Sequence, residues 1–257
     1  MKNAFLVVLL AVSLTGCKDL VPDTQPSGQG DQCTDELRAG LPDTGQAVRV
    51  LCRTEYIAAY DPGRKVPLVV MEHLHAPELA DNVARTDNFQ PDPDLKESES
   101  AALSDYRRSG YDRGHMAPAA DFTATEQAMA ESFYLSNIVP QNHELNAGVW
   151  AALESATRAC AKDLGDVYIL TGPVFEGRSK VIGEGVAVPS SVFKVVVSGN
   201  QARAFLMPNR KLEARSNFLR YEVTADEVQR ATGYTLFPLG GVNLQKRGTF
   251  CSGAFGA

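Results

Sequence analysis

The sequence lacks the marks of several common protein classes. None of its five cysteines is spaced C-x-x-C, so no zinc finger or ribbon is indicated. Beyond about residue 30 there is no apolar run long enough to span a bilayer, no low-complexity block and no internal repeat. The apolar fraction of 44% and the charged fraction of 22% are those of an ordinary globular protein.

Positive charge is also scarce. The chain has 25 basic and 31 acidic side chains, which gives a formal net charge of −6. This excludes a protein that binds nucleic acid through a generally basic surface. Any polyanion site must be a local patch, for which Arg107, Arg108 and Arg113, with Arg85 upstream, are the candidates. A solvated loop is the alternative interpretation of these arginines.

The amino terminus has the pattern of an export signal. Residues 1–16, MKNAFLVVLLAVSLTG, place one lysine before a short apolar run and end on small residues. The next residue, Cys17, completes a sequence that resembles a lipobox, so we expect a lipoprotein signal and a lipidated Cys17. An ordinary signal peptide with a chance cysteine is the alternative. The residue after that cysteine is Lys18, not Asp, which by resemblance to the sorting signals of bacterial lipoproteins favours the outer over the inner membrane. We therefore expect a lipid-anchored protein in the periplasm or at the cell surface.

The domain is expected to follow a flexible tether. Residues 17–44 are rich in Pro, Gly, Ser, Gln and Asp and contain the tether and the start of the domain. Residues 45–257 form the domain itself.

The remaining cysteines suggest disulfides. An even number in an exported chain favours disulfide bonds. Three pairings are open to Cys33, Cys52, Cys160 and Cys251. We favour Cys33 with Cys52 and Cys160 with Cys251, because these pairs would clip the amino-terminal arm and staple the tail.

The order of elements indicates an α+β fold. Strands and helices do not alternate regularly, which argues against a doubly wound sheet. The predicted strands are 48–61, 66–74, 166–175, 193–198 and 202–207. The predicted helices are 125–134, with Thr123 and Glu126 as a capping box, 146–164, ending at Gly165, and one capped by Thr224 and Glu227 that runs to Ala231. Residues 136–142 are expected to be a loop.

The segment YDRGHMAPAADF, residues 111–122, is the first candidate site. His115 follows Gly114 in a stretch expected to be irregular, where glycine permits close approach of a ligand. Arg113 would share a face with His115 if the backbone is extended, and Asp112 could orient its neighbours. An imidazole beside an arginine suits removal of a water proton near a phosphodiester. A structural histidine with satisfied hydrogen bonds is the alternative.

The segment SNIVPQNHELNAGVWAALE, residues 136–154, is the second. Asn146, Trp150 and Glu154 recur every four residues, so on a helix they lie along one slowly drifting stripe. The amide oxygen of Asn146 could bind Mg²⁺, which needs few protein ligands, with Glu154 behind it. The alternative is a capping asparagine, a core tryptophan and a solvent-exposed glutamate.

Together these two segments resemble the DNA/RNA non-specific endonuclease family, the ββα-metal nucleases related to endonuclease G. The DRGH element, the N-x-x-P-Q loop and the N-x-x-x-W-x-x-x-E helix occur in order, and the resemblance extends over about residues 45–240. It implies a ββα-metal fold with a central, mostly antiparallel sheet flanked by helices.

The resemblance also implies roles at the reacting phosphate. His115 corresponds to the general base and Asn146 to the only direct protein ligand of Mg²⁺, for which Mn²⁺ could substitute. Glu154 corresponds to the carboxylate that holds metal-bound water.

Three further residues correspond to substrate-side groups. Arg113 faces the phosphate, Asn137 lies near the base and substrate, and Arg85 is a second phosphate-binding arginine.

The expected function is therefore Mg²⁺-dependent endonucleolytic hydrolysis of DNA and/or RNA, without sequence preference, to products with 5′-phosphates. Activity should fall in acid, below about pH 5, if protonation of His115 removes the base.

Besides the nucleic-acid substrate, we expect contact with a membrane only through the lipid anchor, and a homodimer is left open. One alternative is a catalytically inactive nucleic-acid-binding lipoprotein of the same fold. Another is a zinc enzyme built on His73 and His75, for which the sequence shows no third ligand.

Overall fold

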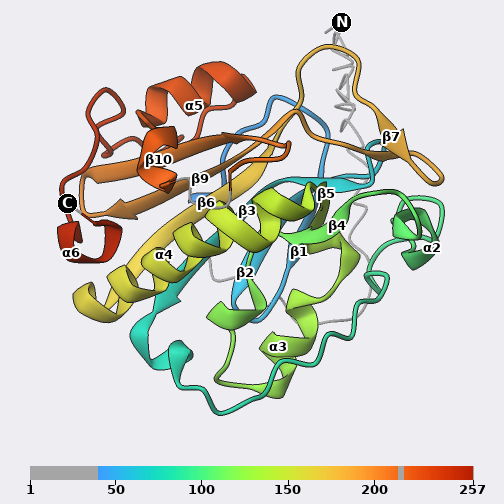
Figure 1. Cartoon of the computed structure of the whole chain (residues 1–257), viewed down its shortest axis with the longest axis horizontal. Helices are drawn as coiled ribbons and strands as arrows, with labels where there is room; N and C mark the ends of the chain where they lie inside the picture. Colours follow the sequence, from blue (N-terminus) through green and yellow to red (C-terminus); the bar gives the residue numbers. More distant parts are fainter. Residues whose placement is uncertain (1–39, 214–216, 257) are drawn as a thin grey trace, which may run out of the picture. The chain divides into compact units, whose positions relative to one another are not determined.

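A single antiparallel sheet organises the domain. The computed structural model describes residues 40–213 and 217–256; the expected signal peptide, Cys17 and Cys33 lie outside this part of the chain. Seven strands form the sheet in the order β1-β2-β3-β6-β9-β10-β11, and every neighbouring pair is antiparallel (Figure 1). The strands are β1 (Arg49–Cys52), β2 (Tyr56–Asp61), β3 (Val66–His75), β6 (Asp166–Val174), β9 (Ser191–Ser198), β10 (Gln201–Pro208) and β11 (Glu222–Val223). The predicted α+β class is confirmed.

Two small sheets accompany the large one. One pairs β4 (Asp112–His115) with β5 (Ile138–Gln141), and the other pairs β7 (Val181–Ile182) with β8 (Val186–Ala187). The prediction of a loop over 136–142 was therefore wrong. A four-residue strand such as β5 has too short a pattern to be recognised locally, and it forms because β4 is there to pair with it.

The helices are mostly short. Those of the described part are α2 (Leu103–Tyr106), α3 (Glu126–Ser132), α4 (Ala151–Leu164), α5 (Ala225–Thr232) and α6 (Ser252–Phe255). A π-helix, Leu145–Trp150, runs directly into α4, and short 3-10 turns occupy Ala76–Leu79, Ala119–Asp121, Leu135–Asn137 and Phe218–Tyr221. No helix in these residues has the length and apolarity needed to cross a bilayer.

Local signals placed some helix ends correctly and one incorrectly. Thr224 and Glu227 form the predicted capping box of α5, with backbone-to-side-chain distances of 3.2 Å and 2.7 Å. The predicted cap of α3 was wrong by two residues, because Thr125 is the N-cap. The Thr123 hydroxyl instead accepts a hydrogen bond from the backbone N–H of Asp81 at 3.1 Å. Thr123 therefore makes a tertiary contact and does not cap α3, although the local sequence pattern favoured it as the cap.

The predicted strand 48–61 is two strands. The chain reverses at residues 53–55, where the Arg53 N–H donates to the Tyr56 carbonyl at 2.8 Å, and β1 then pairs back on β2. The Arg53 side chain is only 4% exposed and reaches the carboxylate of Asp92 at 2.5 Å. This contact, between residues 39 apart in sequence, fixes a turn that the β-branched composition did not reveal.

The sheet has a core on each face. Val70 and Leu74 of β3 belong to the core that contains α4 residues such as Leu153. Val69 and Met71 belong to the other core, which α5 covers through Val228. Side chains alternate along a strand, so from Val69 onward the even-numbered positions of β3 face α4 and the odd-numbered positions face the other way. Figure 1 shows α4 lying across the sheet and α5 beside β10.

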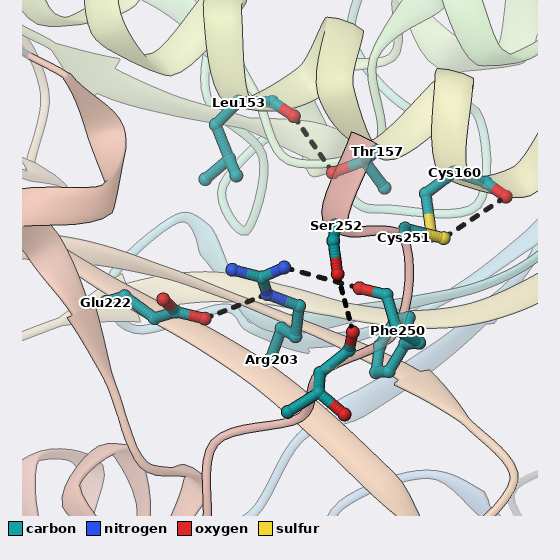
Figure 2. The surroundings of a disulfide bond; sticks show 9 residues. Leu153, Thr157, Cys160, Arg203, Glu222, Phe250, Cys251 and Ser252 are labelled. Atoms are coloured by element: carbon teal, nitrogen blue, oxygen red, sulfur yellow. Dashed lines mark hydrogen bonds and ion pairs between the residues drawn. A yellow bond between two sulfur atoms is a disulfide. The ribbon is translucent and has the colours of Figure 1, made fainter. Parts of the chain in front are cut away.

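One disulfide joins α4 to the carboxyl-terminal segment. Cys160 and Cys251 are bonded, as predicted, across a sequence separation of 91 residues (Figure 2). Arg203 of β10 holds the same segment, donating to the Phe250 carbonyl at 3.3 Å while its Nε lies 2.8 Å from Glu222. Cys52 is also disulfide-bonded, and its predicted partner Cys33 lies outside the described residues.

Candidate active site

The DRGH element is a strand, not the irregular segment expected from the sequence. In the β4–β5 pair Gly114 lies opposite Val139 and His115 opposite Ile138. Arg113 and His115 are two residues apart on β4 and so leave the same face of the strand, as expected, but Arg113 is exposed whereas His115 is only 9% exposed. The pairing with β5 fixes the backbone from which the ring projects.

Gly114 is required by the side chain of Gln141. A Cβ added to Gly114 would lie 2.1 Å from the Gln141 Oε1 and 2.6 Å from its Cβ. Gln141 is itself fully buried, so it has little room to move aside. The glycine of DRGH therefore permits the close approach of β4 and β5 that positions His115.

We expect Gly114→Ala to lower nuclease activity ten- to a hundredfold, because a shift of β4 by about 1 Å misplaces the His115 ring. Plasmid cleavage at a fixed Mg²⁺ concentration measures the loss. The double variant Gly114→Ala with Gln141→Ala should recover much of the activity, since it removes the clashing side chain. Equal losses in the single and double variants would show that this contact is not the reason for the glycine.

The His115 ring lies between two phenylalanine rings. Its centroid is 5.2 Å from that of Phe89 and 5.1 Å from that of Phe133, the latter edge-on. Its Nε2 is buried and has no hydrogen-bond partner in the described residues. Burial and the positive charges of Arg85 and Arg113 lower the pKa of His115 to about 3, although the negative charge of Asp87 acts in the opposite direction. The imidazole is therefore neutral at physiological pH, as a general base must be.

The low pKa of His115 bears on the activity loss that was expected below about pH 5. A ring that stays neutral down to about pH 3 in the free protein does not account for a loss of activity near pH 5. The low value depends partly on the positive charges of Arg85 and Arg113, of which Arg85 is already paired with Asp87. A bound phosphodiester would offset their charge and raise the pKa of His115 towards its ordinary range.

A pocket of about 620 Å³ is lined by three of the candidate arginines and by Asn146. Its lining combines three guanidinium groups with aromatic rings: Arg85, Asp87, Phe89, Leu103, Tyr106, Arg107, Tyr111, Asp112, Arg113 and Asn146. Of the predicted basic patch, only Arg108 is missing from this wall. His115 does not line the pocket either, but Phe89 does, and its ring contacts the imidazole.

Two arginines stack on the rings that enclose His115. The Arg113 guanidinium carbon lies 4.3 Å from the centroid of Phe89, and that of Arg85 lies 5.0 Å from the centroid of Phe133. The Nε of Arg85 is also 2.7 Å from Asp87. These contacts hold the two cations near the imidazole.

Asn146 sits in the π-helix that precedes α4. Gly148 has φ −108° and ψ −109°, which breaks regular helical geometry and alters the angle between Asn146 and Trp150. The predicted stripe of Asn146, Trp150 and Glu154 therefore holds only from Trp150 to Glu154, and Asn146 does not follow the regular helical spacing. Such π segments recur at functional sites because they redirect single side chains. Here Asn146 is brought to the wall of the pocket.

Asp112 orients Asn146. Its Oδ2 accepts from the Asn146 Nδ2 at 3.0 Å and lies 2.9 Å from the His143 Nδ1. Donation through Nδ2 leaves the amide oxygen of Asn146 to act as a ligand. An amide oxygen beside a carboxylate is the kind of donor set that a hard cation such as Mg²⁺ prefers, so these residues fit that ion. His143, to which the sequence gave no role, supports the same carboxylate.

Glu154 of α4 is half-buried and adjoins a buried polar cluster that contains Glu72, Asp121 and Lys194. Burial raises its pKa to about 7, against the positive charge of Lys194 and Arg158. Glu72 of β3 is fully buried, and neither of its carboxylate oxygens has a hydrogen-bond partner in the part of the chain that the structure describes. Burial, together with the negative charge of Asp121, raises the pKa of Glu72 well above the ordinary value. Sequence reasoning missed Glu72, Asp121 and Lys194. A glutamate on the inward face of an apolar strand was the available signal.

Asn137 makes its hydrogen bonds to backbone groups. It is 0% exposed, and its Oδ1 accepts from the Ala117 N–H at 2.9 Å. Its Nδ2 donates to the carbonyls of Ala117 and Ser132 at 2.8 Å and 2.9 Å. These bonds fix the backbone that follows His115, and the role predicted for Asn137 near the base and substrate stays a prediction.

The chain is similar to several known nucleases. Nuclease EXOG, mitochondrial, of Homo sapiens is 32% identical over 256 residues, 92% of this chain and 69% of that protein. Endonuclease G, mitochondrial, of Homo sapiens is 35% identical over 216 residues, 77% of this chain and 72% of that protein. The Danio rerio EXOG nuclease is 37% identical over 220 residues; the match covers 78% of this chain but only 64% of the relative.

A solved structure and a family model extend the likeness to the fold. A structure of an EndoG/EndoGI complex has a TM-score of 0.73 and 30% identity, covering 81% of this chain and 92% of the solved one. Residues 36–240 match the model of the DNA/RNA non-specific endonucleases. That span includes every residue of the pocket and the polar cluster. The chain therefore belongs to the DNA/RNA non-specific endonuclease family.

Proposed function

We propose that this protein is a Mg²⁺-dependent endonuclease that hydrolyses phosphodiester bonds of DNA and RNA without sequence preference and leaves 5′-phosphates. The observation that carries the proposal is the meeting of Arg85, Arg113 and Asn146 at one pocket, beside a neutral His115. Guanidinium groups bind phosphate oxygens, and phosphate contacts carry no base information.

The residues divide the chemistry between them. His115 takes a proton from the attacking water as the water oxygen forms its bond to phosphorus. The bond from phosphorus to the 3′ oxygen breaks, and that oxygen leaves as a hydroxyl after gaining a proton from solvent. Arg113 and Arg85 hold the phosphate and offset its charge. Mg²⁺ held by Asn146 would supply further stabilisation of negative charge on the phosphate and leaving oxygens.

Neighbouring side chains keep these groups in place. Asp112 directs the amide of Asn146, and Asn137 fixes the backbone after His115. Phe89 and Phe133 exclude bulk water from most of the imidazole, which keeps it neutral. Because catalytic contacts often tighten only when substrate is bound, we propose that the 9% of His115 that is exposed marks the side from which water is activated.

We also propose that the protein is exported and anchored to the outer membrane through lipid on Cys17. The signal-like first sixteen residues and the lipobox-like sequence support this. The disulfide between Cys160 and Cys251 fits an oxidising compartment. Outside the cytoplasm, a nuclease of low specificity would be kept away from the nucleic acid of its own cell.

Metal dependence tests the function directly. The purified mature protein should nick plasmid DNA and degrade RNA with Mg²⁺ or Mn²⁺ and lose both activities in EDTA. Asn146→Ala should raise the Mg²⁺ concentration needed for half-maximal rate on the order of tenfold or more, since it removes the proposed ligand. Product ends that accept labelled phosphate from polynucleotide kinase only after phosphatase treatment would identify 5′-phosphates.

The matched control is Asn200→Ala, at the exposed turn between β9 and β10, which should leave the Mg²⁺ requirement unchanged. Activity that survives EDTA, or an unaltered requirement in Asn146→Ala, would contradict the proposed metal site. A protein that binds DNA but never cleaves it under any of these conditions would be the inactive binding lipoprotein instead.

A further inference from the structure

We propose that His73, His75 and Asp166 form a second metal site, selective for a zinc-class transition-metal dication and separate from the magnesium site at Asn146. His73 and His75 are two residues apart near the end of β3, so their side chains leave the same face of the strand. The antiparallel pairing of β3 with β6 sets Asp166 directly opposite His75. The third ligand that the sequence did not show is thus supplied by a strand ninety residues further along.

The three ligand atoms already lie close together. One nitrogen of each imidazole and one carboxylate oxygen all fall within 4.8 Å of one another. The His73 Nε2 is 2.7 Å from the Asp166 Oδ2, and the two imidazole centroids are 3.9 Å apart. Bonds of about 2.0–2.2 Å to zinc put neighbouring tetrahedral ligands roughly 3.3 Å apart. Side-chain rotation alone can therefore bring the three atoms around one ion.

The site has a rigid base. β3 and β6 are interior strands of the large sheet. The Tyr168 ring stacks on His73 with centroids 3.8 Å apart and planes at 11°. Just beyond the histidines, the Ala76 N–H donates to the Gly165 carbonyl at 2.8 Å, which joins the two strand ends. Little conformational entropy remains to be lost when a metal binds.

The ligand chemistry differs from that of the magnesium site. Two imidazoles and one carboxylate suit Zn²⁺ and neighbouring transition metals, whereas Mg²⁺ prefers oxygen ligands alone. The side chains of His73 and Asp166 are 19% and 49% exposed, so an ion from solvent can reach them and water can complete the coordination. The alternative is a plain hydrogen bond between His73 and Asp166 with no metal, and that bond alone would not need His75 beside it.

The two sites lie on opposite faces of the sheet. By the alternation along β3, His73 and His75 share the face of Val69 and Met71, away from α4. Asp166 follows the carboxyl end of α4, whereas Asn146 precedes its amino end. The 14 residues of α4 separate these ends by about 21 Å at 1.5 Å per residue. The ion would clamp the end of β3 to the start of β6 and take no part in hydrolysis.

Direct metal titration tests the clamp. The mature protein, stripped with EDTA and dialysed, is titrated with ZnCl₂ in a calorimeter and with Co²⁺ in an absorption spectrometer. We expect one Zn²⁺ per chain with a micromolar or tighter Kd, visible Co²⁺ bands of tetrahedral type and a higher melting temperature with zinc. His75→Gln and Asp166→Asn should each weaken binding at least tenfold and abolish the thermal shift.

Two controls separate this site from the catalytic one. Asn146→Ala should keep full zinc affinity, and so should His143→Gln, which removes the exposed histidine beside Asp112. Circular dichroism of the metal-free variants checks folding, and the exposed position of Asp166 makes Asp166→Asn the variant least prone to misfold. Zinc binding that is absent in the wild-type chain, unchanged in both site variants, or lost in Asn146→Ala would overturn the proposal. The readout is binding, so it stands whether or not the chain cleaves DNA.

Discussion

Replacing His115 with alanine should lower the rate of plasmid cleavage by roughly two to four orders of magnitude, the range for loss of a positioned general base. The ring is neutral because burial and the charges of Arg85 and Arg113 lower its pKa to about 3. No other imidazole of the described residues lies between Phe89 and Phe133. Initial rates at saturating Mg²⁺ measure the effect.

Added imidazole separates chemistry from folding in this variant. Alanine leaves a ring-sized space between the two phenylalanines, so millimolar imidazole should restore part of the rate if the missing group is a base. His143→Gln is the matched histidine control and should cost less than tenfold, because its exposed ring contacts only the Asp112 carboxylate among the site residues. A His115→Ala protein with near-native turnover would refute the assignment of the base.

Replacing Asp92 with alanine should reduce the free energy of unfolding by about 3–5 kcal/mol, the cost of stranding one member of a buried ion pair. The Asp92 and Arg53 side chains are 0% and 4% exposed and meet at 2.5 Å. The Ser136 hydroxyl also donates to Asp92. Without this carboxylate the guanidinium of Arg53 keeps the half-exposed Asp94, the Cys52 carbonyl and the ring of Tyr134 as partners. Urea denaturation followed by circular dichroism gives the difference.

Asp94 provides the matched control for that measurement. It binds the same arginine at 2.7 Å, but its side chain is 42% exposed, so Asp94→Ala should cost less than about 1 kcal/mol. Replacing both buried partners with apolar residues, Arg53→Met with Asp92→Leu, should recover at least half of the loss, since no charge is then stranded. Comparable losses for Asp92→Ala and Asp94→Ala would show that burial does not set the strength of this pair.

The Asp92 contact also shows how the stability of the fold reaches the site. Two residues before Asp92, Gln90 forms a β-bridge with Tyr134, and Phe89 packs on the His115 ring. The buried ion pair therefore anchors the segment that supplies one wall of the catalytic pocket. Partial loss of activity in Asp92→Ala at temperatures where it remains folded is consistent with this link.

Elements with strong local signals were predicted closely. The β9–β10 hairpin and β6 agree with prediction to within about two residues at each end, and α4 ends at Gly165 as expected. The capping box of α5 is formed by the predicted residues. Continuous apolar runs, a Gly–Asn turn and a Thr-x-x-Glu cap each act over fewer than ten residues, so the sequence contains nearly all of the information they need.

Elements that depend on distant partners were predicted poorly. The turn at residues 53–55 exists because Arg53 reaches Asp92, and β5 exists because it pairs with β4. The cap of α3 moved because Thr123 was already bound to Asp81. In each case a contact between residues far apart in sequence outweighed the local preference.

The residues of the candidate site also fall into those that the sequence predicted and those that only the structure revealed. The identities of His115, Arg113 and Asn146 were predicted from motif and resemblance, and the structure places Arg113 and Asn146 on one pocket. Asn137, expected near the base and substrate, is buried and hydrogen-bonded to the backbone next to His115, and His115 is itself buried. Glu72, Asp121 and Lys194 went unnoticed, since a charged residue in an apolar strand acquires meaning only when its buried partners are known.

The amino-acid sequence alone determined the family, the mostly antiparallel α+β architecture and the Cys160–Cys251 pair, because short motifs and residue periodicity are properties of neighbouring positions. Only the tertiary structure decided the protonation of His115, the purpose of Gly114 and the meeting of His73, His75 and Asp166. The pKa of a group depends on the charges around it and on how far it is buried from solvent, and this metal site depends on the register between two strands. Both are set by residues brought together from distant parts of the chain.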